Sequence, residues 1–203
     1  MTSGSEAPPL PPPQPPAAAA RAVSEAAQAV ADAWAQPMDT AEHNRAISQL
    51  YSILRDLGIA TKGLARYQTT GAPAWPASQD FRRLVASSAE QLLRASESLD
   101  GVPAAEGLGA VPDPEDPGTL LCRATRNAIT AWRQPAGTSA ERDAILEPLI
   151  TTIGFLSAAT RSLATHAPRR RTIELHAVAA ILSEVTARLS KASPSSQEPN
   201  GRE

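Results

Sequence analysis

Three consecutive arginines give the chain its most concentrated positive charge. Arg169, Arg170 and Arg171 follow Pro168, with a histidine not far away on either side. Guanidinium groups bind phosphates through paired hydrogen bonds, so the cluster is a candidate contact for a nucleic acid. The chain contains no aromatic RNA-binding motif, zinc knuckle or long basic helix, and a short arginine run is also typical of a solvated turn. Nucleic acid is therefore an alternative partner and not the favoured one.

Trp75 is the second residue whose type suggests a binding role. It lies in a loop-like segment between Pro73 and Pro76. Tryptophan often anchors protein interfaces, because burial of its large ring is strongly favourable. The alternative is a ring folded back over the protein's own core. The second half of the chain has no counterpart of Trp75, so we treat it as a candidate contact for another protein.

The other reactive residues form no catalytic or metal-binding pattern. The chain has three histidines and one cysteine, Cys122, whose nearest basic neighbour in the sequence is Arg123. It has no Glu-x-x-His pair, no His-Glu-x-x-His, no paired cysteines, no glycine-rich phosphate loop and no Gly-x-Ser-x-Gly turn. A cysteine beside two leucines is typical of a buried thiol. We expect no enzymatic activity, no metal and no cofactor.

Membrane association and export are also not expected. No stretch of 18 apolar residues is present, as a transmembrane helix would need. The first 16 residues contain no lysine or arginine and no apolar segment of the kind found in signal peptides. The Ala- and Arg-rich composition is similar to that of high-GC bacterial proteins. We therefore expect a bacterial cytoplasmic protein.

The composition favours a helical fold. Only seven of the 203 residues are aromatic, so the core must be built mainly from alanine and the aliphatic residues. Apolar residues recur at spacings of three and four rather than two, which is typical of amphipathic helices. We predict an all-α fold, a six-helix bundle of two tandem three-helix units related by a pseudo-two-fold axis, with disordered termini.

A repeated Trp-x-Gln-Pro motif is the basis for the two units. Trp34 and Pro37 belong to the first copy, and Trp132 and Pro135 belong to the second copy, 98 residues later. Each copy stands where one helical pattern stops and the next begins, because a residue before proline is disfavoured in a helix. We predict structural roles for these four residues: each tryptophan packs at the end of a helical hairpin.

The chain divides into five segments by composition. They are a Pro-rich disordered tail (1–16), a first unit (17–100), an acidic linker rich in Pro and Gly (101–118), a second unit (119–193) and a polar disordered tail (194–203). In the first unit, helices are predicted at about 17–35, 39–67 and 79–100. In the second unit, helices are predicted at about 119–133 and 170–192, and a third helix between them begins after a cap at residue 138. Two capping boxes, Asp39 with Glu42 and Thr138 with Glu141, mark the start of the middle helix of each unit.

The two middle helices differ in register around Pro148. Ile145 matches Ile47 at a spacing of 98 residues, whereas Leu149 matches Leu50 at a spacing of 99. Proline removes a helical hydrogen bond and clashes with the preceding turn. We predict that a kink or π-bulge at 145–149 absorbs the extra residue, which gives Pro148 a structural role.

The sequence thus favours a non-enzymatic interaction or scaffold protein. Its partner is expected to be another protein, and a homo-oligomer is also compatible. Two alternatives remain open. The second unit has ten basic and five acidic residues, a balance of +5, and would suit an accessory nucleic-acid-binding protein. The other alternative is a small-molecule sensor with an apolar pocket between helices.

Overall fold

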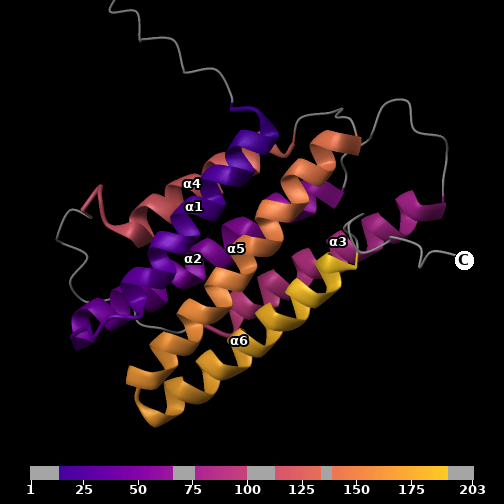
Figure 1. Ribbon diagram of the computed structural model, residues 1–203. Coiled ribbons are helices and arrows are strands. Elements are labelled where there is room, and N and C mark those ends of the chain that lie inside the picture. The colour runs from indigo at the N-terminus through magenta and orange to yellow at the C-terminus, as the bar shows by residue number, and fades with distance from the viewer. Residues whose placement is uncertain (1–13, 66–75, 100–112, 134–138, 192–203) are drawn as a thin grey trace, which may run out of the picture.

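The computed structural model describes residues 14–65, 76–99, 113–133 and 139–191 (Figure 1). These residues form six helices and no strand, so the predicted all-α bundle is confirmed. The helices are α1 (Pro16–Trp34), α2 (Thr40–Ala65), α3 (Pro76–Glu97), α4 (Pro117–Ala131), α5 (Ser139–His166) and α6 (Arg169–Ser190). Predictions that concern the two tails, most of the linker, Trp75 and Pro135 fall outside the described residues.

The starts of α2 and α4 follow from local capping chemistry. At α2, Asp39 Oδ1 accepts a hydrogen bond from the Glu42 backbone N–H at 2.8 Å, and Glu42 Oε2 accepts one from the Asp39 N–H at 2.9 Å. This is the reciprocal capping box expected from the sequence. At α4, Asp116 is the N-cap, and its Oδ2 accepts from the Thr119 N–H at 2.8 Å. Pro117 takes the first helical position, where a missing N–H costs nothing, so α4 begins two residues earlier than predicted.

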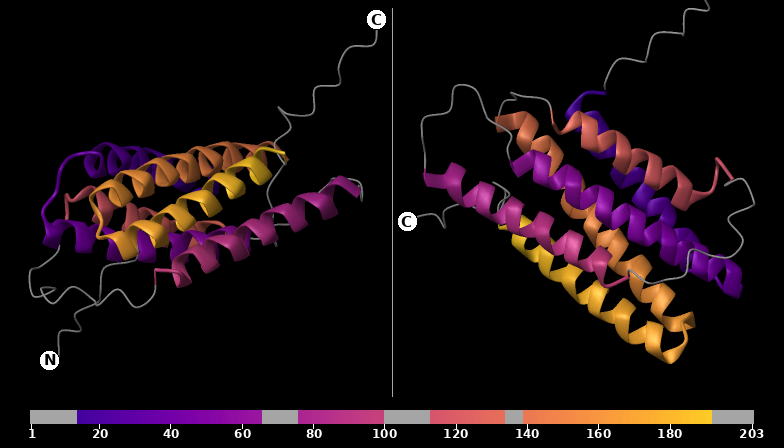
Figure 2. Two further views of the ribbon diagram at one scale, coloured as in Figure 1. Left: turned by 90° about the horizontal axis from the view of Figure 1, so that it is seen from below. Right: turned by 180° about the vertical axis from the view of Figure 1, so that it is seen from behind.

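The six helices form three layers of two. Figure 1 shows α1 and α4 along one side of the molecule, α2 and α5 in the middle, and α3 and α6 along the opposite side; Figure 2 gives two further views. In the outer layers, α1 packs beside α4 and α3 packs beside α6. Apolar residues from all six helices form one continuous hydrophobic cluster. The two halves of the chain therefore bury a shared core.

The outer helices α1 and α4 each pack mainly on the opposite half of the chain. α1 packs on α5 and α4 packs on α2. Conversely, α3 packs on α2 and α6 on α5, within their own halves. Each of these contacts has its counterpart when the halves are interchanged, which is the pattern that a pseudo-two-fold axis produces. Neither half builds a self-contained three-helix bundle, because each takes a covering helix from the other.

The predicted π-bulge at 145–149 is wrong. α5 is one continuous α-helix from Ser139 to His166, with Pro148 inside it and no π-helical residue. Its start follows that of α2, Thr40, by 99 residues, and burial repeats at the same spacing throughout both helices. Residues 46, 47, 50, 54, 57 and 64 of α2 are buried, and so are residues 145, 146, 149, 153, 156 and 163 of α5. Since Trp132 follows Trp34 by 98 residues, the extra residue lies between Trp132 and Ser139, and Pro148 has no insertion to absorb.

Candidate functional site

Trp34 and Trp132 lie in the interior, at the ends of α1 and α4. Trp34 is 5% exposed, and Trp132 is fully buried. The Trp132 indole Nε1–H donates to the backbone oxygen of Pro16, the first residue of α1, at 3.2 Å. Pro37 lies exposed in the turn that follows α1. The indole thus joins the start of α1 to the end of α4, a contact that the sequence pattern did not predict.

His43, the buried histidine among the described residues, also makes a contact between the two halves. Its Nε2 lies 2.9 Å from the backbone oxygen of Leu163 in α5. A carbonyl oxygen can only accept, so the ring donates from Nε2 and ties the start of α2 to the last turn of α5. The His43 ring thus supplies a hydrogen-bond donor to the Leu163 carbonyl in the last turn of α5, where backbone carbonyls lack N–H partners within the helix.

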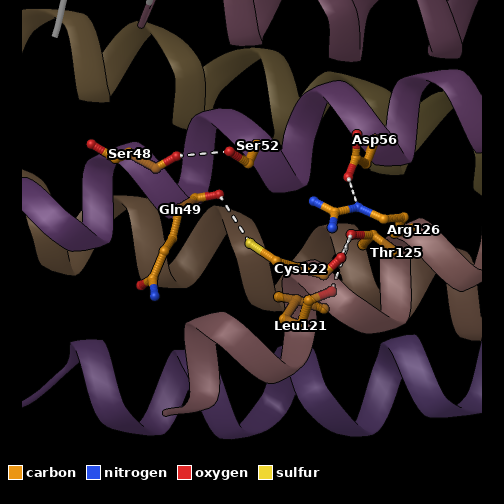
Figure 3. A network of polar contacts seen from close by, with 8 residues as sticks. All are labelled: Ser48, Gln49, Ser52, Asp56, Leu121, Cys122, Thr125 and Arg126. Atoms are coloured by element: carbon orange, nitrogen blue, oxygen red, sulfur yellow. Dashed lines mark hydrogen bonds and ion pairs between the residues drawn. The ribbon is translucent and has the colours of Figure 1, made fainter. Parts of the chain in front are cut away.

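Cys122 faces α2 in a network of polar contacts between α2 and α4 (Figure 3). Its Sγ lies 3.9 Å from the backbone oxygen of Gln49, toward which the thiol donates. Burial raises the pKa of the thiol to about 11, and the nearby carboxylate of Asp56 adds to the increase. A thiol with this pKa is protonated at neutral pH and is a poor nucleophile.

Asp56 and Arg126 continue this network along the same two helices. Burial raises the pKa of the Asp56 carboxyl group, and this effect outweighs the opposing influence of Arg126 and Arg55. Arg126 Nε lies 3.9 Å from Asp56 Oδ2, and the arginine side chain is 75% exposed. An ion pair this long and this exposed contributes little to stability.

Gln49 anchors the start of α4 to α2. Its Nε2 donates to Asp116 Oδ2 at 2.6 Å, the same oxygen that caps α4. Sequence periodicity did not reveal this role of Gln49, because it shows which face of a helix is buried but not which polar side chain meets a partner. These polar groups hold helices together.

The three arginines of the predicted basic cluster have different surroundings. Arg171 is half-buried, and its Nη1 lies 2.6 Å from Glu174 Oε2. The side chain of Arg170 is 93% exposed and lies 3.7 Å from the other oxygen of Glu174. Arg169 is exposed at the first position of α6. Glu174 therefore offsets part of the positive charge that the sequence places here.

One exposed strip of α6 combines apolar and charged side chains. We call it the α6 outer face, and it comprises Arg170, Ile173, Ala177, Ala180, Ile181 and Glu184. Spacings of three and four residues place these side chains on one side of the helix. Ile173 is 67% exposed, whereas Ile181 is half-buried and packs on the edge of the core. Ile173 was not singled out from the sequence, although its position outside the buried stripe of α6 was a usable signal.

A hollow lies between α1 and α5 beside Pro148. Its volume is about 270 Å³, and it is lined by Pro148 together with five residues that have polar or charged groups: Arg21, Ser24, Glu25, Glu147 and Thr151. Across the described ranges, no three or more His, Cys, Asp or Glu side chains gather closely enough to hold a metal ion. No helix in those ranges is long and apolar enough to cross a membrane.

Comparison with known proteins finds no relative. No family model matches the chain, and neither a curated protein nor a solved structure is similar enough to count as a match.

Proposed function

We propose that the chain is a non-enzymatic helical module that binds another protein through the α6 outer face. The observation that carries this proposal is the 67% exposure of Ile173 on a well-formed helix, between charged residues. Partial burial of a large aliphatic side chain by a partner is favourable, and a rigid helix presents it at little entropic cost. Trp75 stays a predicted second contact, in the segment that precedes α3.

The interior contacts support a non-enzymatic role. His43 and Cys122, the residues best suited by type to acid–base or nucleophilic chemistry, hold helices together through backbone carbonyls. The raised pKa of Cys122 keeps its sulfur protonated. These residues act as ties between the halves of the bundle, as a scaffold requires.

A pair of matched substitutions tests the proposed surface. Among the described residues, the other large apolar side chain with clear exposure is Leu120, 39% exposed on α4 in the opposite outer layer. Affinity purification from the source cells should recover a binding partner with wild-type protein and with Leu120→Asp, but not with Ile173→Asp. Equal recovery with both variants, at unchanged helical circular dichroism, would exclude the α6 outer face as the binding surface.

Nucleic-acid binding is a second candidate, supported by the exposure of Arg169 and Arg170 at the first turn of α6. The ion pairs with Glu174 weaken this candidate because they neutralise charge at the same place. A duplex DNA shift that falls with salt, and is lost when all three arginines are replaced by alanine, would favour it. Binding that survives this replacement would exclude the arginine cluster.

A tandem duplication is proposed as the origin of the two halves. Its support is a matched crossing of helices: a Cβ atom at Gly58 would lie 3.3 Å from the backbone oxygen of Ala89, and Ser157 Oγ donates to the backbone oxygen of Ala179 at 3.2 Å. Ser157 follows Gly58 by 99 residues, the spacing that relates α2 to α5. Ala179 follows Ala89 by 90 residues, the spacing at which the buried residues of α3 recur in α6. A bacterial, cytoplasmic protein likewise stays a proposal, supported by composition alone.

A further inference from the structure

We propose that the partner of the α6 outer face is a second copy of this chain, with the two α6 helices packed antiparallel about a two-fold axis at Ala177. This inference rests on the proposed function and names its partner. The α6 outer face fits such a pairing because its residues are complementary to themselves when the helix direction is reversed.

The complementarity follows from positions along α6. In an antiparallel pair centred on Ala177, residues equally far before and after it lie opposite each other. Ile173 then meets Ile181 of the second copy, and Arg170 meets Glu184. Each contact occurs twice, because a two-fold interface uses the same patch on both subunits. The two copies bury apolar side chains at the centre and join opposite charges at both ends.

The side chains leave room for this contact. Ala177 and Ala180 are exposed and small, so two helix backbones can approach closely along the strip. Figures 1 and 2 show the N-terminal end of α6, which carries Ile173, extending past the end of α3. On the other half of α6, Arg188 Nη1 donates to Ser87 Oγ of α3 at 2.8 Å, so α3 lies beside that end, but Ala180 and Glu184 stay exposed there.

The charged residues keep surface available for a second copy. The Arg170 side chain is 93% exposed, and its distance to Glu174 of 3.7 Å is longer than a good hydrogen bond. Glu184 contacts Arg188 within its own helix, but its side chain is still 54% exposed. Each can therefore gain a partner across the two-fold axis without losing a buried contact.

Sedimentation equilibrium of the full chain over a range of concentrations tests self-association. We expect the mass to rise from 21.2 kDa toward twice that value with wild-type protein and with Leu120→Asp. Ile173→Asp should remain monomeric, with unchanged helical circular dichroism, because this side chain is exposed. A dimer that Ile173→Asp leaves intact would overturn the inference.

Charge reversal tests the predicted orientation. Arg170→Glu or Glu184→Arg alone should weaken dimerisation about tenfold or more, because like charges then face each other. The double variant should recover dimerisation, because the pair across the axis is restored. Recovery cannot come from within one helix, because each substituted side chain then stands beside a residue of its own charge, Glu174 or Arg188. Failure of the double variant to recover would overturn the antiparallel register.

A cysteine at the axis gives an independent readout. In a Cys122→Ser background, Ala177→Cys should form a disulfide-linked dimer when diamide oxidises the two facing thiols. Ala29→Cys, at an exposed alanine on α1, serves as the matched control and should form no disulfide-linked dimer. Equal cross-linking of both variants would contradict a two-fold axis at residue 177.

The outcomes separate this inference from the proposed function. A wild-type chain that is monomeric at every concentration, but loses a different protein partner upon Ile173→Asp, would refute the dimer and leave the proposed function standing. If the wild-type chain is monomeric and Ile173→Asp does not change its binding to other proteins, both the dimer and the proposed function are refuted.

Discussion

Gly58 of α2 lies directly against Leu93 of α3: a Cβ atom on the glycine would be 2.9 Å from both Cγ and Cδ2 of the leucine. The matching positions in the second half are Ser157 and Ser183, whose hydroxyl oxygens lie 3.1 Å apart. In the first half, the crossing therefore pairs a glycine, which has no side chain, with a large leucine side chain. In the second half, it pairs two small, polar serine side chains. The two crossings solve the same packing problem with different pairs of residues.

Single and double substitutions at this crossing should be strongly coupled. Gly58→Ser alone should lower the free energy of unfolding by about 1–3 kcal/mol, because the new side chain overlaps Leu93. Adding Leu93→Ser removes the overlap, so the double variant should cost less than the sum of the single changes by at least about 0.5 kcal/mol. Urea denaturation measures all three variants. Additive effects would show that the two crossings are not equivalent.

Gly154→Ala is the control for glycine removal itself. A Cβ atom at Gly154 meets no atom within 4 Å, so this change should stabilise α5 by up to about 1 kcal/mol through helix propensity.

Replacing Trp132 by phenylalanine should cost more than the same change at Trp34. Both rings are buried, but Trp132 also donates to the Pro16 oxygen, and Pro16 is itself buried. Phenylalanine leaves this oxygen without its donor, which adds about 1–3 kcal/mol to the cost of the smaller ring. Thermal or chemical denaturation of the two variants gives the difference. Equal losses would show that the hydrogen bond does not contribute.

Cys122 should react slowly and make stability decline at alkaline pH. A shift of the thiol pKa from 9.0 to about 11 lowers the thiolate fraction near pH 8 roughly 100-fold, so reaction with iodoacetamide should slow by a similar factor. Because the folded state holds this proton more tightly than the unfolded state, the free energy of unfolding should fall as pH rises from about 9 to 11. Cys122→Ser should remove this part of the pH dependence. A thiol as reactive as that of the unfolded chain would contradict the burial that raises its pKa.

Pro148→Ala should stabilise the protein. α5 continues through Pro148 as an α-helix, so an alanine N–H at this position can bond to the backbone oxygen of residue 144. The gain should reach up to about 3 kcal/mol, the typical cost of proline inside a helix. Glu147→Ala, at the neighbouring exposed position, should change the free energy of unfolding much less. A loss of stability with Pro148→Ala would mean that α5 needs the proline for its shape.

The two halves should fold together and not separately. Residues 1–108 alone lack α5, on which α1 packs, and residues 109–203 alone lack α2, on which α4 packs. Each fragment should show weak helical circular dichroism and no cooperative melting, whereas an equimolar mixture should recover both. A fragment that melts cooperatively by itself would show that one half is an independent domain.

The helices were largely predictable, because local chemistry determines them. The capping box of Asp39 and Glu42 and the buried stripes of the helices emerged as expected. The partners of α1 and α4 were not predictable, because periodicity identifies a buried face without identifying the helix that covers it. An alanine-rich stripe such as that of α1 is complementary to almost any neighbour.

The misplaced insertion has a similar cause. Pairing Ile145 with Ile47 relies on residue type, but Ile145 and Leu146 are both fully buried, and burial pairs Ile47 with Leu146. Two adjacent apolar residues allow either register, and only the packed structure distinguishes them. The α6 outer face was missed for a different reason: a single isoleucine off the buried stripe, such as Ile173, is common on protein surfaces.

The packing of α1 on α4 and α5 also bears on how the chain reaches its native state. Most small helical proteins fold quickly because neighbouring helices pair first. Here the hydrogen bond between Trp132 and Pro16 spans 116 residues, and that between His43 and Leu163 spans 120. During synthesis the apolar stripe of α1 emerges long before α4 and α5, so its alanines and valines stay uncovered until most of the chain has been made. The core of this helical bundle is thus completed only after α4 and α5, in the second half of the chain, have been synthesised.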